Sequence, residues 1–334
     1  ASTITFLRSA NSLKHMASVT TWQLVLFLAT IAFISAIFII LYKKCFEKYF
    51  AVEEPSDRKA IATGIMMLLS GALIIPLRGG IGVAPINAGS VYFSSKMFLN
   101  HTAVNAVWNV GTTAFSQKPV ENPYKFTDPG EALIAADSLN RPGGKTEMVL
   151  NNQSPNILFL VLESFSSYLV GPLGGDSLVT PNLNRYLREG IVFSNLYASG
   201  NRTDKAMPAI LNGYPAQPAQ SIIKEPRKSQ TLPGLVKIFN EKGYRSSFWY
   251  GGEIDFANFN SYVYGSGFSD LVTMDNFNAA DYNSKWGVHD HVLFSTLRDS
   301  MLDMHEPFFR VVLTLSSHEP FDVPAVPVFE GSDQ

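Results

Sequence analysis

An uncharged run at residues 21–42 constrains the fold of this chain more than any other feature. As an α-helix that rises about 1.5 Å per residue, the run is long enough to cross the hydrocarbon core of a bilayer, which is about 30 Å thick. Trp22 and Tyr42 stand at its two ends, where aromatic side chains favour the level of the lipid headgroups. A buried core helix of this length rarely lacks charge altogether. The run therefore predicts a transmembrane helix.

A second uncharged run covers residues 60–77, and beside the first run it is interpreted as the return span. Five basic residues occupy the connecting loop 43–59, namely Lys43, Lys44, Lys48, Arg58 and Lys59. Basic residues in a short loop mark the cytoplasmic side of a membrane. The region 21–78 is thus predicted to hold two transmembrane helices of a multi-pass cell-membrane protein. Residues 1–20 and everything after residue 78 are expected outside the cytoplasm, and a chain that begins outside is expected to be a piece that lacks earlier helices.

The charge and cysteine content of the chain exclude some classes of function. Charged residues make up 16% and hydrophobic residues 46% of the chain, and the two apolar runs account for part of this imbalance. The formal net charge of −2 argues against a nucleic-acid partner. The single cysteine, Cys45, excludes an intrachain disulfide and a cysteine-rich zinc cluster.

Residues 79–152 are predicted to join the membrane helices to a folded domain. Glycine and proline between residues 79 and 89 indicate a loop that leaves the membrane. Interleaved aromatic residues at 91–115 indicate interfacial helices, and residues 118–145, rich in proline, glycine and aspartate, are interpreted as a linker.

Strand and helix patterns alternate from residue 153 to residue 334. The apolar run 156–162 is typical of a central strand covered on both faces. Thr180 is expected to cap a following helix. Further strands are predicted at 191–197, 245–250 and 307–315, and helices at 180–189, 203–211, 232–242 and 288–301. This alternation predicts a doubly wound α/β domain, whose sites lie at the carboxyl ends of its strands.

Four residues are candidates for chemistry at those strand ends. Glu163 directly follows the first strand and is either a surface residue or a metal ligand. Thr203 begins a helix, so it is either a plain N-cap or a nucleophile aimed at a phosphate held by free N–H groups. Arg202 beside it suits phosphate oxygens. His318 follows the last strand and is either structural or a phosphate-binding group that protonates a leaving group.

Four motifs in order resemble the sulfatase-like branch of the alkaline phosphatase superfamily. They are Asn156 to Ser164, Thr180 to Asn184, Gly200 to Asp204 and Ser317 to Phe321. The nearest match is the group of lipoteichoic acid synthases and phosphoglycerol transferases. Sulfatases convert a Cys or Ser in a C/S-x-P-x-R motif into formylglycine, whereas this chain has Thr203 and no such motif. The membrane helices ahead of an outer enzyme domain are similar as well.

The resemblance implies a metal-dependent transferase with a truncated catalytic domain at 153–334. Glu163 and Thr203 are implied metal ligands, with Thr203 also the nucleophile that forms a phospho-threonine intermediate. His318 is implied to contact the substrate phosphate or glycerol. The metal is expected to be Mn²⁺ or Mg²⁺, with Zn²⁺ as an alternative. The implied donor is a phosphatidylglycerol-like phospholipid, and the implied acceptor is a hydroxyl of a glycan or polymer.

The chain departs from that family pattern in two places. It has no Gly-Asp-His segment, so the expected Asp-His metal pair is placed beyond Gln334, and Asp290 is interpreted as a structural helix start. Phe256 to Asn260 stand where some relatives have a substrate-binding Trp and Arg. Three alternatives stay open: a phosphoethanolamine transferase, which the lack of cysteines after Cys45 disfavours, another hydrolase of the superfamily, or a degenerate membrane-tethered scaffold.

Overall fold

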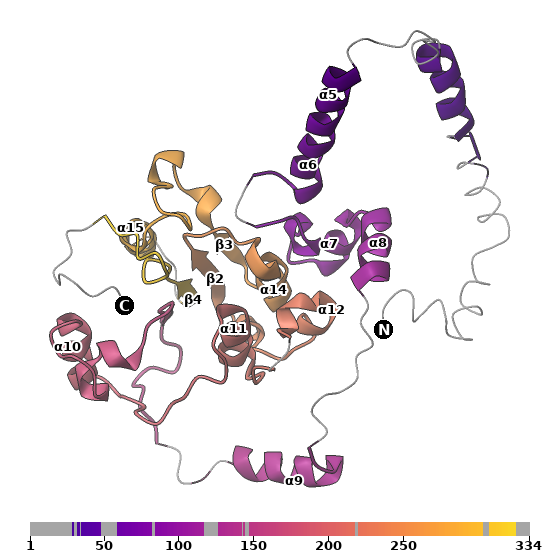
Figure 1. Ribbon diagram of the computed structural model, residues 1–334. Coiled ribbons are helices and arrows are strands. Elements are labelled where there is room, and N and C mark those ends of the chain that lie inside the picture. The colour runs from indigo at the N-terminus through magenta and orange to yellow at the C-terminus, as the bar shows by residue number, and fades with distance from the viewer. Residues whose placement is uncertain are drawn as a thin grey trace. The chain divides into compact units, whose positions relative to one another are not determined.

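The computed structural model describes ten stretches of the chain, and the chain divides into two compact units. The described residues are 29, 32–33, 35–47, 59–81, 84–116, 126–141, 143, 147–217, 220–302 and 307–324. One unit comprises residues 1–77 and 105–142, and the other comprises residues 78–104 and 143–334 (Figure 1). Each unit is described by itself.

The first unit contains an apolar helical segment that matches the predicted return span. Helix α5 runs over Lys59–Ala72 and α6 over Ile74–Arg78, and together they give one candidate membrane span, Ala60–Arg78, with no part of it buried. Pro76 has no N–H to donate to the carbonyl of Ala72, which explains the interruption between the two helices. Within the described ranges this is the one helix long and apolar enough to cross a membrane.

The first predicted span lies largely outside the described residues, so two transmembrane helices are not supported. Residues 35–41 are helical, and the helix continues through the π-helix η1, Tyr42–Phe46, to Glu47. Helical conformation therefore extends at least as far as Glu47, beyond the predicted boundary at Tyr42. Side chains such as Lys43 and Lys44 belong to this helical end and not to a loop.

The predicted linker at 118–145 contains a helix, which corrects the sequence-based expectation. Helix α9 covers Pro129–Asn140. The carboxylate of Asp128 accepts a hydrogen bond from the N–H of Gly130 at 2.8 Å, and Pro129 fits the first helical position. The helices expected within 91–115 are present as α7, Met97–Ala103, and α8, Ala106–Ser116.

The second unit is built on a parallel sheet with the strand order β1-β4-β2-β3. The strands are β1 (Ile157–Val161), β2 (Arg245–Tyr250), β3 (Asp270–Val272) and β4 (Phe308–Leu313). The predicted strands at 156–162, 245–250 and 307–315 are confirmed, and β3 was not predicted. In the strand register, four apolar residues lie side by side across the sheet: Phe159, Val311, Phe248 and Leu271.

Helices cover both faces of this sheet, as Figure 1 shows. On one face, Phe309, Val311 and Leu313 of β4 pack with residues of α11 (Thr203–Asn212), α13 (Leu235–Glu241) and α14 (Phe259–Ser266). On the other face, Val312 and Trp249 pack against α15 (Asp290–Leu302). Alternate residues of a strand point to opposite faces, so β4 presents apolar side chains to both, with the buried Arg310 beside them on the α15 face. The predicted doubly wound α/β architecture is confirmed.

Three local expectations are wrong. Residues 191–197 form a loop and not a strand, with Phe193 76% and Tyr197 84% exposed. Strand β1 lies at the edge of the described sheet, and its Leu158 and Leu160 are exposed. An apolar run predicts strand conformation but not which neighbours pair with it. Thr180 does not cap α10 (Pro181–Glu189), because its hydroxyl donates to the carbonyl of Leu169 at 2.6 Å.

Short helical turns complete the second unit. They are η2 (Ala88–Val91), η3 (Ser167–Leu169), η4 (Gly171–Leu173), η5 (Ile222–Lys224), α12 (Pro226–Ser229), η6 (Phe256–Asn258), η7 (Met274–Asn276) and η8 (Ala279–Asp281). The turns η2 and η6 matter most for the site, since both pack against α14 although they lie far apart in the sequence.

Candidate active site

A pocket of about 350 Å³ opens at the carboxyl edge of the sheet. Strands β1, β4 and β2 end in register at Val161, Leu313 and Tyr250, so the residues that follow them meet at one edge. All four residues predicted from the sequence, Glu163, Arg202, Thr203 and His318, line this pocket.

Thr203 and Glu163 form the centre of the site. The Thr203 hydroxyl lies 2.9 Å from each carboxylate oxygen of Glu163 and donates its proton to this carboxylate. Thr203 is the first residue of α11, where backbone N–H groups are free of helical partners. A hydroxyl, a carboxylate and a helix N-terminus with free N–H groups are thereby brought together.

Strand β4 holds Glu163 in place. The backbone N–H of Glu163 donates to the Thr314 hydroxyl at 2.9 Å, and the N–H of Thr314 donates to the carbonyl of Val161 at 3.1 Å. Ser164 then adopts a left-handed conformation with φ of 52° and donates its hydroxyl to Glu163 at 3.3 Å. These contacts fix the Glu163 backbone at the point where β1 ends.

Arg202 occupies the N-cap position of α11 without capping it through its side chain. Its Nε lies 3.6 Å from the carboxylate of Asp204, which is buried while the Arg202 side chain is 60% exposed. The guanidinium is therefore only loosely held, and its free edge remains open to phosphate oxygens in the pocket.

His318 lies in the turn after β4, and Asp290 holds this turn. The Asp290 carboxylate accepts hydrogen bonds from the N–H groups of Leu315 and Ser316, at 2.8 and 2.9 Å. This geometry agrees with the structural interpretation of Asp290. The His318 ring meets Trp286 edge-on with 4.6 Å between ring centroids, and its Nδ1 lies 3.0 Å from the carbonyl of Glu319.

Sequence reasoning missed three residues that line the pocket: Tyr250, Glu253 and Trp286. Glu253 follows β2 after two glycines, just as Glu163 follows β1, so the strand-end rule could have found it. Tyr250 ends that strand, and its ring packs on Gly252, where an added Cβ would lie 2.4 Å from the ring. Trp286 opens the stretch Trp286 to Asp290, which the sequence indicated only as a structural helix start.

The carboxylates around Tyr250 shape the electrostatics of the pocket. Burial raises the pKa of the Tyr250 phenol, and the nearby charges of Glu163, Asp290 and Glu253 raise this pKa further. Its hydroxyl therefore stays protonated at physiological pH. It can donate a hydrogen bond to an anionic substrate but cannot act as a base.

Glu163 and Thr203 fit a divalent cation in chemical type. Carboxylate and hydroxyl oxygens are hard donors of the kind that Mg²⁺ and Mn²⁺ accept. In the portions of the chain that the structure describes, no group of three or more His, Cys, Asp or Glu side chains could hold a metal ion. The described residues thus provide part of a ligand set.

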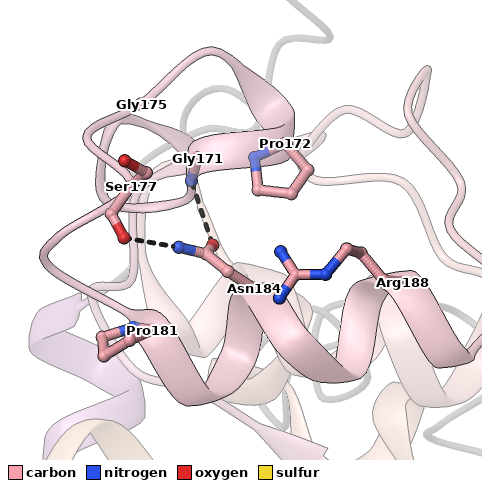
Figure 2. A pocket seen from close by; sticks show the side chains of 7 residues that line it. All are labelled: Gly171, Pro172, Gly175, Ser177, Pro181, Asn184 and Arg188. Carbon is pink, nitrogen blue, oxygen red and sulfur yellow. Dashed lines mark hydrogen bonds between the residues drawn. The ribbon is translucent and has the colours of Figure 1, made fainter.

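A separate pocket of about 360 Å³ lies between α10 and the loop before it (Figure 2). The amide of Asn184 accepts from the N–H of Gly171 at 3.1 Å and donates to the carbonyl of Ser177 at 2.9 Å. Arg188 extends along the same side of the helix in Figure 2. Asn184 of the Thr180 to Asn184 motif therefore folds this loop onto its helix.

Comparison with known proteins adds the family to this geometry. The sulfatase family profile matches residues 155–330, more than half of the chain, including every predicted site residue. Lipoteichoic acid synthase 2 of Bacillus subtilis is 25% identical over 230 residues, which cover 66% of this chain and 34% of that protein. Lipoteichoic acid synthase of Staphylococcus aureus strain USA300 is 25% identical over 228 residues, covering 60% and 35%. The chain thus spans about a third of the length of these curated relatives.

A solved structure agrees with this assignment. The crystal structure of a protein in the alkaline phosphatase superfamily from Vibrio parahaemolyticus matches with a TM-score of 0.50 and 30% identity, over 55% of this chain and 46% of that one. The resemblance predicted from the motifs is confirmed. With the family profile spanning the parallel sheet and the whole pocket, this chain belongs to the sulfatase family.

Proposed function

We propose that the chain is part of a membrane-anchored phosphotransferase that moves phosphoglycerol from a phosphatidylglycerol-like lipid to a hydroxyl of a glycan or polymer. The observation that carries this proposal is the contact between Thr203 and Glu163 at the N-terminus of α11. The names of the two lipoteichoic acid synthases support the class of reaction. An apolar helix at Ala60–Arg78 supports the membrane anchor.

In the first half-reaction Thr203 Oγ attacks the phosphorus of the lipid headgroup. The Oγ–P bond forms as the bond from phosphorus to the diacylglycerol oxygen breaks. The hydroxyl proton leaves along the hydrogen bond to Glu163, and His318 supplies a proton to the departing oxygen. Arg202 and the free N–H groups of α11 hold the phosphate oxygens. Diacylglycerol leaves, and phosphoglycerol remains on Thr203.

In the second half-reaction an acceptor hydroxyl attacks the same phosphorus. Its proton passes to the imidazole of His318, and Thr203 takes back its own proton from Glu163 as the Oγ–P bond breaks. Glu163 and Thr203 are the residues that would hold Mn²⁺ or Mg²⁺, with Zn²⁺ as an alternative. Such an ion, when bound, lowers the pKa of the hydroxyl and offsets phosphate charge.

One observation favours a second donor, a phosphoethanolamine lipid. The carboxylate of Glu253 lines the pocket with the aromatic rings of Phe256 and Trp286, whose centroids are 6.1 Å apart. An ammonium group is attracted by a carboxylate and by the faces of aromatic rings. The absence of cysteines after Cys45 counts against this alternative.

The test is turnover of fluorescent phosphatidylglycerol and phosphatidylethanolamine by the full-length protein in lipid nanodiscs. Thr203→Ala is expected to lower turnover by on the order of 10³-fold or more, because the nucleophile is lost. Thr180→Ala is the matched control, since Thr180 is a threonine at the start of another helix, α10, whose hydroxyl contacts Leu169 and Asn184 and does not line the pocket. Full turnover by Thr203→Ala would refute the mechanism, and the donor preference separates the two lipids.

A further inference from the structure

The chain that follows the apolar helix returns to the wall of the active-site pocket. Helix α6 ends at Arg78, and the N–H of Ile86 donates to the Arg78 carbonyl at 2.8 Å. From there residues 84–92 run beside η6 and α14, within the second unit. Residues 84–92 are called the strap below.

Four hydrogen bonds join the strap to the segment 253–260. The N–H of Ala84 donates to the Glu253 carboxylate at 3.3 Å, and the amide of Asn87 donates to the carbonyl of Asp255 at 2.8 Å. The amide of Asn260 donates to the carbonyls of Gly89 and Tyr92, at 3.0 and 3.2 Å. Asn260 is 8% exposed, so these bonds are shielded from water.

Close packing adds to these bonds. Gly89 is buried, and an added Cβ there would lie 2.4 Å from the side-chain oxygen of Asn258. Only glycine lets the strap approach this closely. Ala257 and Asn258 both have positive φ, 54° and 67°, which costs energy for residues with a Cβ. Surrounding contacts must therefore hold this conformation, and the strap provides several of them.

The segment that the strap holds forms one wall of the pocket. Glu253, Phe256, Ala257 and Phe259 all line it, whereas Asn260 and the strap itself do not. The strap therefore contacts the wall without lining the pocket itself, and it reaches one lining side chain, the carboxylate of Glu253.

We propose that the strap positions this wall, and that Asn260 is the positioning residue that links the chain leaving the apolar helix to substrate affinity. The structural part of this inference stands alone, and its kinetic part rests on the proposed function. Loss of the Asn260 side chain removes the donor to the Tyr92 carbonyl and leaves the Gly89 carbonyl with the Tyr92 N–H, so residues 253–259 should open more often. Substrate would then bind less tightly, while the contact between Thr203 and Glu163 stays intact.

The experiment compares the full-length wild type with Asn260→Ala by hydrogen–deuterium exchange and by kinetics with the lipid donor. The amides of Phe256, Asn258 and Asn260 donate to backbone carbonyls of the same segment and report its opening. We expect their exchange to accelerate roughly tenfold. The KM for the donor should rise by a similar factor, with little change in kcat.

Asn240→Ala is the matched control. Asn240 donates to the carbonyl of Gly267 at 2.6 Å, just beyond the other end of α14, and does not touch the pocket. It should leave exchange at residues 256–260 and the KM unchanged. Gly89→Val disrupts the packing between the strap and the segment 253–260 from the strap side. It replaces Asn260→Ala in the experiment if Asn260→Ala does not fold.

Wild-type exchange and KM in both Asn260→Ala and Gly89→Val would overturn the proposal. Effects in Asn240→Ala as large as those in Asn260→Ala would overturn it as well. If the wild type transfers neither lipid headgroup, the proposed function fails, but the exchange measurement still decides whether the strap holds the wall.

Discussion

At the scale of single residues, the site depends on the pairing of one hydroxyl with one carboxylate. Both Glu163 oxygens lie 2.9 Å from Thr203 Oγ, yet a hydroxyl has one proton to give. Even with the Ser164 hydroxyl also donating to Oε1, the carboxylate keeps lone pairs for another positive partner. This surplus of acceptors is what a divalent cation would use.

Glu163→Gln tests that surplus. The glutamine carbonyl can still accept the Thr203 proton, so the fold should persist, but the negative charge is gone. We expect turnover to fall roughly 10²- to 10³-fold and Mn²⁺ affinity, measured by calorimetry on the full-length protein, to fall at least about tenfold. Unchanged Mn²⁺ binding would remove Glu163 from the metal site.

A second prediction at this scale concerns pH. Tyr262 of α14 is 1% exposed, and its hydroxyl donates to Asn212 at 2.5 Å. Burial raises the pKa of Tyr262 above the ordinary value of 10.0. Above pH 10 the unfolded chain loses this proton while the folded chain retains it, so the contribution to stability is complete below pH 10 and is lost as pH rises beyond it.

Tyr262→Phe removes this titration. The variant should be about 1 kcal/mol less stable at pH 7, because the bond to Asn212 is lost. Its free energy of unfolding should then decline less steeply than that of the wild type between pH 10 and pH 11. Denaturant unfolding followed by circular dichroism measures both slopes, and equal slopes would show that Tyr262 does not contribute.

At the scale of elements, the sequence predicted what local pattern determines. Strand β4 is a buried and mostly apolar run, β2 ends in the aromatic residues 248–250, and α11 begins at the predicted Thr203, so all three were found. Strand β3 has only three residues, too few for a pattern. Helix α14 is rich in aromatic, Ser and Asn residues, which are modest helix formers, and its burial stabilises it instead.

The same distinction applies to the site. Glu163 and His318 could be predicted because strand ends meet at one edge of a parallel sheet. Trp286 could not, because its loop reaches the pocket through long-range contact. Gly287 has a φ of 138°, and an added Cβ there would lie 2.3 Å from the carbonyl of Gly251. That close approach depends on tertiary structure and not on a local pattern.

Asp290→Ala tests how α15 supports the site. The Asp290 carboxylate accepts from two backbone N–H groups of the turn that carries His318. Loss of both charged bonds should destabilise the protein by about 3 kcal/mol and lower kcat/KM by freeing His318.

Asp299→Ala on the same helix is the control. Its carboxylate is 61% exposed and pairs with neighbouring Arg298, so it should change stability by less than about 0.5 kcal/mol. Equal unfolding free energies would contradict this role of Asp290.

At the scale of the whole molecule, the low content of charged residues is explained in part by two long uncharged runs, residues 21–42 and 60–77. The apolar helix Ala60–Arg78 has no buried part, so the free energy of its apolar side chains depends on surroundings other than the protein core. Under the proposed function, a chain anchored by this helix would keep its pocket beside a lipid donor and so raise the effective concentration of that donor. Within the second unit, the strap at 84–92 follows this helix in the sequence and is hydrogen-bonded to Asn260 beside the pocket wall.

The single cysteine makes the proposed membrane topology testable. Cys45 is exposed and lies in the region predicted to be cytoplasmic, whereas Ser154 is exposed in the domain predicted to be outside. A charged maleimide does not cross the hydrocarbon core, so it labels only cysteines on the outer side of intact spheroplasts. Wild-type Cys45 should react only after permeabilisation. Ser154→Cys combined with Cys45→Ser should react at once. Labelling of both positions before permeabilisation would show that no bilayer separates them, and the reverse pattern would place the pocket on the cytoplasmic side, away from an extracellular acceptor.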